Sequence, residues 1–256
     1  MTRRVLNIIL AAAGSVAAVA IWLAADAAGA RNRHYISCKE VKTTILDSAQ
    51  RRFVSGKDVE LFLEDYGSWL GQRIDEVDLG RIESILDSKG AVRKSNAWTG
   101  YDGVLHIELS QREPVIRFQA GNLGWYADNT GFLFPLQEKF TVRVPIVDGA
   151  IPLSLAPGFK GEPENEKERE WLLRMTALAR EMGGFWTERI SQISVLPDGE
   201  LLMIPRQGTE RFHFGQPTDQ KEKLEKMKLY YECIAPAREK PYTSVDLRYR
   251  GQIVCR

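Results

Sequence analysis

The side chains best suited to metal binding or to acid–base chemistry at neutral pH are three histidines, at positions 34, 106 and 213. No two of them stand at the i, i+4 spacing that places a pair of metal ligands on one helix face. A carboxylate cluster, Asp75, Glu76 and Asp78, directly precedes a predicted helix, where capping explains it better than catalysis. The sequence therefore predicts no catalytic residue, no metal site and no cofactor.

The three cysteines, Cys38, Cys233 and Cys255, show neither C-x-x-C nor metal-ligand spacing. The favoured interpretation is three thiols, two of them buried as small apolar groups. In an oxidising compartment, a Cys233–Cys255 bridge is the alternative.

An apolar segment near the N-terminus limits where the protein can work. Val5 to Ala25 are 21 consecutive residues without a charged side chain, preceded by Arg3 and Arg4. As a helix this segment is about 30 Å long, which matches the hydrocarbon core of a bilayer. It predicts a single-pass anchor.

A cleaved signal peptide is the competing interpretation of this segment. The stretches 25–27 and 28–30 both fit an A-x-A cleavage site. The apolar run is longer than the 7–15 residues typical of a signal, and Trp22 stands where an interfacial aromatic belongs. Basic residues on both sides leave the orientation open.

The charge balance narrows the function classes. The chain carries 35 basic and 34 acidic residues, whereas a nucleic-acid-binding protein needs a basic excess on one face. The charge balance therefore argues against nucleic-acid binding. The region after residue 35 is long enough for two modest cores.

Periodicity in the first half predicts a small α+β unit. A strand over 39–46 precedes a helix with Ser55 as its N-cap and Asp58 three residues on. A second helix begins near Asp78 and ends at Gly90. Two strands follow, of which the second begins after a turn at 102–103. The order strand, helix, helix, strand, strand is typical of helices on one face of a short sheet.

The second half predicts a mixed β-domain with helices. Residues 125–127 and 132–134 form a strand pair, and a loop spans 151–163. A helix runs from about 164 to 182 and ends at two glycines. Strands are predicted near 190–196, 200–204 and 210–214. A helix then starts at Asp219, with Glu222 completing a capping box. The chain ends in two strands, 242–249 and 252–255.

Several motifs occur in a fixed order along the chain: Phe53-Val54-Ser55-Gly56-Lys57-Asp58-Val59, Arg112-x-Pro114, Trp125-Tyr126-x-Asp128-x-x-Gly131 with Pro135, Arg143-Val144-Pro145, and Tyr242-x-x-Val245-Asp246-Leu247-Arg248-Tyr249-x-Gly251. Together with the apolar segment, this order resembles the FtsQ (DivIB) family of bacterial cell-division proteins over nearly the whole chain.

The resemblance implies a domain plan and a location. Residues 1–4 would be a cytoplasmic tail, 5–25 a transmembrane helix and 26–35 a linker. Residues 36–111 would be a POTRA-like domain and 112–256 a β-domain. The protein would sit in the inner membrane with its bulk in the periplasm, concentrated at the septum. The tail of four residues is shorter than is usual in the family, and the chain ends directly after its last strand.

The resemblance also implies a function without catalysis. The chain would be a divisome scaffold that links FtsB-like and FtsL-like single-pass partners to septal peptidoglycan synthesis, with no nucleic acid and no small-molecule substrate.

The last strand offers a physical route to partner binding. A final strand has one neighbour, and its other edge is a template for strand addition. Arg248 would pair with a partner carboxylate and Tyr249 would anchor on apolar surface. The predicted partner-binding residues are Arg248, Tyr249, Gly251, Gln252, Ile253, Val254 and Cys255.

Two other functions fit the sequence less well. A membrane-tethered cell-wall hydrolase needs convergent acid–base or nucleophilic groups, and the sequence shows no such set. A POTRA-bearing transport component needs a following membrane barrel, for which the remaining length is too short.

Overall fold

The computed structural model describes residues 15–25 and 36–256, except 65–66, 68, 238 and 241. The chain forms two compact units. The first takes the chain up to Leu46 and then Val54–Ser110, and the second takes Asp47–Phe53 and Gln111–Arg256. The chain therefore passes between the units three times.

Residues 15–25 are helical. Within the described ranges, no helix combines the length and the apolar character needed to cross a bilayer. The rest of the predicted anchor, the four-residue tail and the linker lie outside the described residues, as do His34 and most of both candidate cleavage sites.

The first unit has the predicted element order. Its elements are β1 (Glu40–Ile45), α2 (Gly56–Glu64), α3 (Leu79–Asp87), β2 (Val92–Thr99) and β3 (Val104–Gln111). The three strands form one sheet in the order β1-β3-β2, with β1 parallel to β3. Alternate residues of β3 are buried, and they form the unit's core together with the apolar sides of the helices (Val59, Leu63, Ile82, Ile85, Leu86). The α+β class predicted from the sequence is confirmed.

The predicted capping box at the start of α2 is formed. Ser55 Oγ donates to Asp58 Oδ2 at 2.6 Å, and the backbone N–H of Ser55 donates to the same oxygen at 2.9 Å. Asp78 caps α3 in a simpler way, by accepting from the N–H of Arg81 at 2.9 Å.

Removing this cap gives a first testable effect. Ser55→Ala should lower the free energy of unfolding of the first unit by about 1 kcal/mol, because Asp58 loses its hydroxyl partner. Urea denaturation followed by circular dichroism measures the change. Ser55→Thr keeps the hydroxyl and should stay within about 0.5 kcal/mol of the parent chain. Equal losses in both variants would contradict the capping role.

The edge of the first sheet at β2 is occupied by side chains of α3. The N–H of Ser95 donates to Asp87 Oδ1 at 2.7 Å, and the N–H of Ala97 donates to Glu83 Oε1 at 2.8 Å. Two main-chain donors of this edge strand are thus already satisfied.

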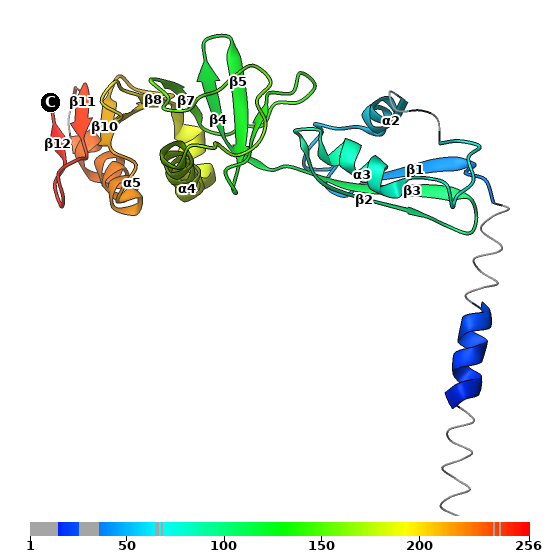
Figure 1. Ribbon diagram of the computed structural model, residues 1–256. Coiled ribbons are helices and arrows are strands. Elements are labelled where there is room, and N and C mark those ends of the chain that lie inside the picture. Colours follow the sequence, from blue (N-terminus) through cyan, green and yellow to red (C-terminus); the bar gives the residue numbers. More distant parts are fainter. Residues whose placement is uncertain (1–14, 26–35, 65–66, 68, 238, 241) are drawn as a thin grey trace, which may run out of the picture. The chain divides into compact units, whose positions relative to one another are not determined.

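The second unit is built on a nine-stranded sheet in the order β12-β11-β10-β9-β8-β7-β4-β5-β6 (Figure 1). Its strands are β4 (Pro114–Ala120), β5 (Leu123–Asp128), β6 (Leu133–Pro135), β7 (Ile146–Gly149), β8 (Ile190–Val195), β9 (Leu201–Pro205), β10 (Arg211–Gly215), β11 (Ser244–Asp246) and β12 (Val254–Cys255). Its helices are α4 (Glu166–Arg189), α5 (Gln220–Leu229), the π-helix η1 (Tyr230–Ile234) and the 3-10 helix η2 (Ala235–Ala237). The β4–β7, β7–β8 and β10–β11 pairs are parallel, and the β4–β5, β5–β6, β8–β9, β9–β10 and β11–β12 pairs are antiparallel.

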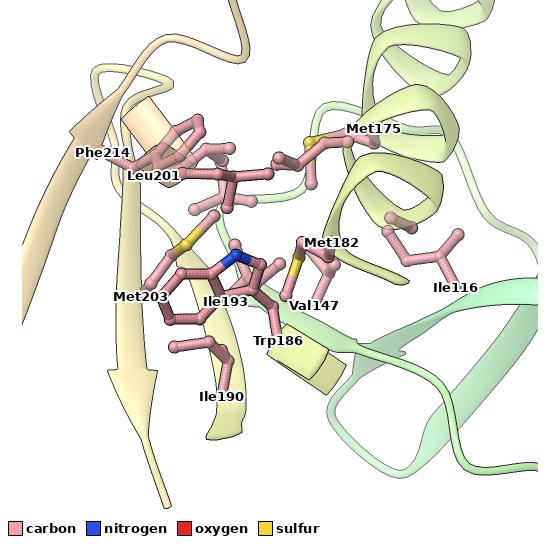
Figure 2. Close-up of a cluster of buried hydrophobic side chains, with 14 of the residues drawn as sticks. Ile116, Val147, Met175, Met182, Trp186, Ile190, Ile193, Leu201, Met203 and Phe214 are labelled. Atoms are coloured by element: carbon pink, nitrogen blue, oxygen red, sulfur yellow. The ribbon is translucent and has the colours of Figure 1, made fainter. Parts of the chain in front are cut away.

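The core of this unit lies between α4, α5 and one face of the sheet. Figure 2 shows Met182 and Trp186 of α4 directed at Ile193 and Met203 of the sheet, and Met175 of the same helix directed at Leu201. These side chains are 6% exposed or less. One side of α4 therefore packs on the sheet.

Three local predictions are wrong. The helix predicted to end at residue 182 resumes after a break at Gly183 (φ 54°, ψ −164°) and continues to Arg189, because Trp186 returns to the core. The capping box at α5 is absent: Asp219 has φ 50° and its side chain accepts no capping hydrogen bond. The last two strands are shorter than predicted: after Leu247, whose N–H still bonds to His213 of β10, the main chain at Tyr249 and Gly251 bonds to α5 instead of continuing the sheet.

The segment Asp47–Phe53 belongs to the second unit. The side chain of Gln111 donates to Asp47 Oδ1 at 3.0 Å and to the carbonyl of Arg51 at 2.8 Å. The ring of Phe53 lies 5.8 Å from that of Tyr126 and 5.2 Å from that of Phe140. This segment is therefore part of the second unit's packing.

Candidate partner-binding edge

The strand β12 lies at one edge of the nine-stranded sheet, and its neighbour in the sheet is β11 (Figure 1). The pairing is antiparallel, with Val245 opposite Cys255 and Asp246 opposite Val254. The predicted position of the last strand, beside the strand that precedes it, is thus observed.

The main-chain hydrogen bonds show which groups of β12 point away from the sheet. Arg256 and Ser244 exchange both of their hydrogen bonds, at 2.9 and 3.0 Å, so the N–H and C=O of Arg256 point toward β11. Main-chain groups alternate in direction along a strand. Those of Val254 therefore also point toward β11, whereas those of Ile253 and Cys255 point outward.

The core face of the sheet is incompletely covered near β12. Three partly buried residues lie against the core there and form what we call the apolar strip: Tyr242, Ile253 and Cys255. Ile253 and Cys255 are two residues apart and point to the same face. A further strand beside β12 would lay every second side chain over this strip.

The turn between β11 and β12 is held by α5. Lys226 donates to the carbonyls of Leu247 and Tyr249, and Glu222 accepts from the N–H of Gly251. Gly251 has φ +66°, a conformation that favours glycine. The Tyr249 side chain is 52% exposed, and Gln252 is exposed and donates its N–H to the carbonyl of Tyr249 at 3.2 Å.

Arg248 already has two carboxylate partners within its own chain. Its guanidinium lies 2.6 Å from Asp246 Oδ2 and 2.9 Å from Glu200 Oε2. Hydrogen bonding to Arg248 holds the pKa of Asp246 below its ordinary value, and Asp246 and Glu200 raise that of Arg248. The three side chains together carry a net charge of −1, so a partner carboxylate would have to compete for Arg248. The pairing of Arg248 with a partner stays a prediction.

The sequence prediction missed two residues of this region, Glu222 and Lys226. Glu222 was assigned to a capping box and Lys226 received no role. The available signal was the i, i+4 spacing of the two residues on a helix whose apolar face includes Leu224 and Met227.

Motif residues far from this edge have a structural role. Asp128 is 4% exposed and accepts hydrogen bonds from the N–H and hydroxyl of Thr130, the N–H of Phe132, and Arg112 Nη1 at 2.8 Å. The guanidinium carbon of Arg112 lies 3.4 Å from the centroid of the Phe132 ring. These contacts fix the β5–β6 turn.

The histidines and cysteines considered for metal binding or catalysis do not come together in one site within the described residues. The ring of His106 stacks on that of Trp98, with the ring centroids 5.2 Å apart and an angle of 6° between the ring planes. Among the described residues, no three histidine, cysteine or acidic side chains are placed to hold a metal ion. No cysteine is in a disulfide within the described chain, which contains all three. Cys38 is buried, but Cys255 is half-buried and Cys233 is exposed, so the expectation of two buried thiols is wrong.

Comparison with known families agrees with this architecture. Residues 113–256 match the family model described as FtsQ/DivIB, C-terminal related, and residues 36–110 match the model of a POTRA-like domain. The chain belongs to the FtsQ/DivIB family. The first match alone covers more than half of the chain. No curated protein matches the chain.

Membership in the FtsQ/DivIB family assigns the chain to bacterial cell division, with a role as a scaffold for interactions among division proteins. The resemblance found in the sequence motifs is therefore confirmed at the level of the family.

Proposed function

We propose that the chain is a non-enzymatic scaffold of the division machinery that binds its partner by strand addition at β12. The partner is an FtsB-like single-pass protein, with an FtsL-like protein in the same assembly, and the complex connects to septal peptidoglycan synthesis. The contacting residues of the chain are Arg248, Tyr249, Gly251, Gln252, Ile253, Val254 and Cys255.

The observation that supports this proposal most is the position of β12. It lies at the end of the strand order, and the outward direction of the Ile253 main chain offers a donor and an acceptor to an added strand. The apolar strip beside it gives such a strand a surface on which alternate side chains are buried. This chemistry favours a partner segment with apolar residues at every second position.

The anchor is part of the same proposal. The uncharged segment from Val5 to Ala25 would span the inner membrane with the N-terminus in the cytoplasm and both units in the periplasm. Tethering to one membrane would raise the effective concentration of other single-pass partners around β12. Attaching a reporter that is active on one side of the membrane to each end of the chain tests this orientation.

A proline at the outward position tests the binding mode. In the full chain, Ile253→Pro should weaken binding of the extracytoplasmic segment of an FtsB-like protein by about 100-fold or more, because proline removes the outward N–H and its ring blocks the approach of a strand. Isothermal titration calorimetry measures the affinity.

Ile253→Ala is the matched control. It shortens the same side chain but keeps the N–H, so binding should weaken only severalfold through loss of apolar contact. Circular dichroism establishes that both variants are folded. Wild-type affinity in folded Ile253→Pro would contradict strand addition at β12, and no binding by the parent chain would contradict the choice of partner.

The alternative of a membrane-tethered cell-wall hydrolase receives no support from either family match. We therefore retain the scaffold as the single proposed function.

A further inference from the structure

A lysine buried in α5 bonds to the main chain that leads into β12. The Lys226 side chain is 8% exposed. Its Nζ lies 3.1 Å from the carbonyl oxygen of Leu247, 2.7 Å from that of Tyr249 and 3.0 Å from Glu222 Oε1. An ammonium group has three N–H donors. All three are therefore used, two of them on the turn between β11 and β12.

Glu222 completes the contact from the same face of the helix. Its Oε1 accepts from Lys226 one helical turn later and from the N–H of Gly251 at 3.0 Å. The bond from Gly251, followed by that from Lys226, holds the pKa of Glu222 below its ordinary value. We call Glu222 and Lys226 the α5 clamp.

The clamp and the turn depend on each other. Burying an ammonium group is unfavourable unless its donors are satisfied, and two acceptors of Lys226 are available only while residues 247–249 keep this path. The pairing of the two strands is short, because β11 has three residues and β12 has two, and only β11 has a second strand, β10, beside it. Hairpins this short are not stable alone. The clamp supplies three of the polar contacts that fix the turn.

We infer that the α5 clamp positions β12 for its partner, so that Glu222 and Lys226 set the affinity of the edge without touching the added strand. This inference rests on the function proposed above. Its physical basis is preorganisation: the apparent dissociation constant rises in inverse proportion to the fraction of molecules in which the edge is formed. If loss of the clamp leaves the turn ordered in about a tenth of the molecules, binding weakens about tenfold.

Two measurements on the full chain test the inference. One is the affinity for the extracytoplasmic segment of the FtsB-like protein. The other is hydrogen exchange, followed by mass spectrometry, in the peptide that contains Gly251. Lys226→Met removes the three donors and keeps an unbranched apolar stem. It should weaken binding about tenfold and speed exchange, because the open fraction of the turn rises as the formed fraction falls.

Variants on the same helix serve as controls. Lys228→Met removes an exposed lysine whose nearest carboxylate, Glu232, is 3.6 Å away at the surface, and both measurements should stay unchanged. Glu222→Gln keeps an oxygen for the N–H of Gly251 and should have a smaller effect than Glu222→Ala. Because Glu222 is 39% exposed, these two variants test the clamp even if Lys226→Met does not fold.

The outcomes separate the inference from the proposed function. Parent-like binding by both Lys226→Met and Glu222→Ala, beside a parent chain that binds, overturns the inference and leaves the function standing. Weaker binding with unchanged exchange also overturns it, because preorganisation requires the two to move together. If the parent chain does not bind at all, the proposed function fails and the role of the clamp in binding fails with it.

Discussion

Replacing Asp128 by alanine should lower the free energy of unfolding of the second unit by about 3 to 5 kcal/mol. The substitution removes the carboxylate that pairs with Arg112, whose side chain is 13% exposed, and leaves a buried cation without its partner. Within the described part of the chain, Arg112 Nε is buried without a hydrogen-bond partner, so the Phe132 ring would be the main remaining contact of the guanidinium. The N–H groups of Thr130 and Phe132 lose their acceptor as well. Urea denaturation followed by near-ultraviolet circular dichroism measures the change.

A double variant shows how much of this effect comes from the unpaired charge. Arg112→Met combined with Asp128→Ala removes both ions, so part of the lost stability should return relative to Asp128→Ala alone. Glu113→Ala serves as the surface control, because its carboxylate is 75% exposed, and it should change stability by about 0.5 kcal/mol or less. A loss below about 1 kcal/mol in Asp128→Ala would show that the pair contributes little to the β5–β6 turn.

Phe212→Ala should destabilise the second unit by a similar amount, about 3 to 5 kcal/mol. Phe212 is fully buried in β10, directly opposite Val245 of β11, and its ring meets those of Tyr230 at 5.4 Å and Tyr231 at 5.6 Å. Truncation removes apolar contacts and leaves a cavity beneath the strands that carry the candidate partner-binding edge. Thermal denaturation followed by calorimetry measures the loss of stability, and binding should weaken with it because β11 supports β12.

Phe185→Ala is the matched control for this cavity. Phe185 is 49% exposed on α4 and contacts Trp186 and Arg189, so its truncation should cost less than about 1.5 kcal/mol. Equal losses in the two phenylalanine variants would mean that the core around β10 closes over the missing ring.

Features that depend on a few neighbouring residues followed from the sequence. The cap of α2 needs only Ser55 and Asp58, and the cap of α3 needs only Asp78 and the next helical turn. The β5–β6 pair was visible because its two strands flank an Asx-Gly turn, and Asp128 does bind the N–H groups of that turn.

Features that depend on contacts between distant parts of the chain could not be predicted from the sequence. The strand β7 lies between β4 and β8 and is parallel to both, an arrangement for which no local turn provides a signal. The strands β4 and β7 were themselves not predicted. Glu222 was assigned to a helix cap because that contact is local, whereas its observed partner, Gly251, is 29 residues away.

The candidate edge has one feature that could be predicted from the sequence and one that could not. That the last two strands pair was predictable from their short connection, but their lengths were not, because Lys226 holds the main chain of residues 247–249. The resemblance to the FtsQ/DivIB family came from the order of motifs along the chain. Of those motif residues, Arg112 and Asp128 bond to each other in the second unit, far along the strand order from the candidate partner-binding edge.

The carboxylates of α3 that bind the amides of β2 bear on self-association. If an open sheet edge of one copy pairs with a different sheet edge of the next copy, the contact is head-to-tail. Such contacts need not close into a ring, so they can build filaments. With eight residues, β2 is the longest strand at an end of either sheet. Since Asp87 and Glu83 already hold the N–H groups of Ser95 and Ala97, β2 offers a poor template to β12 of another copy. The arrangement works against filaments in which β12 of one copy pairs with β2 of the next.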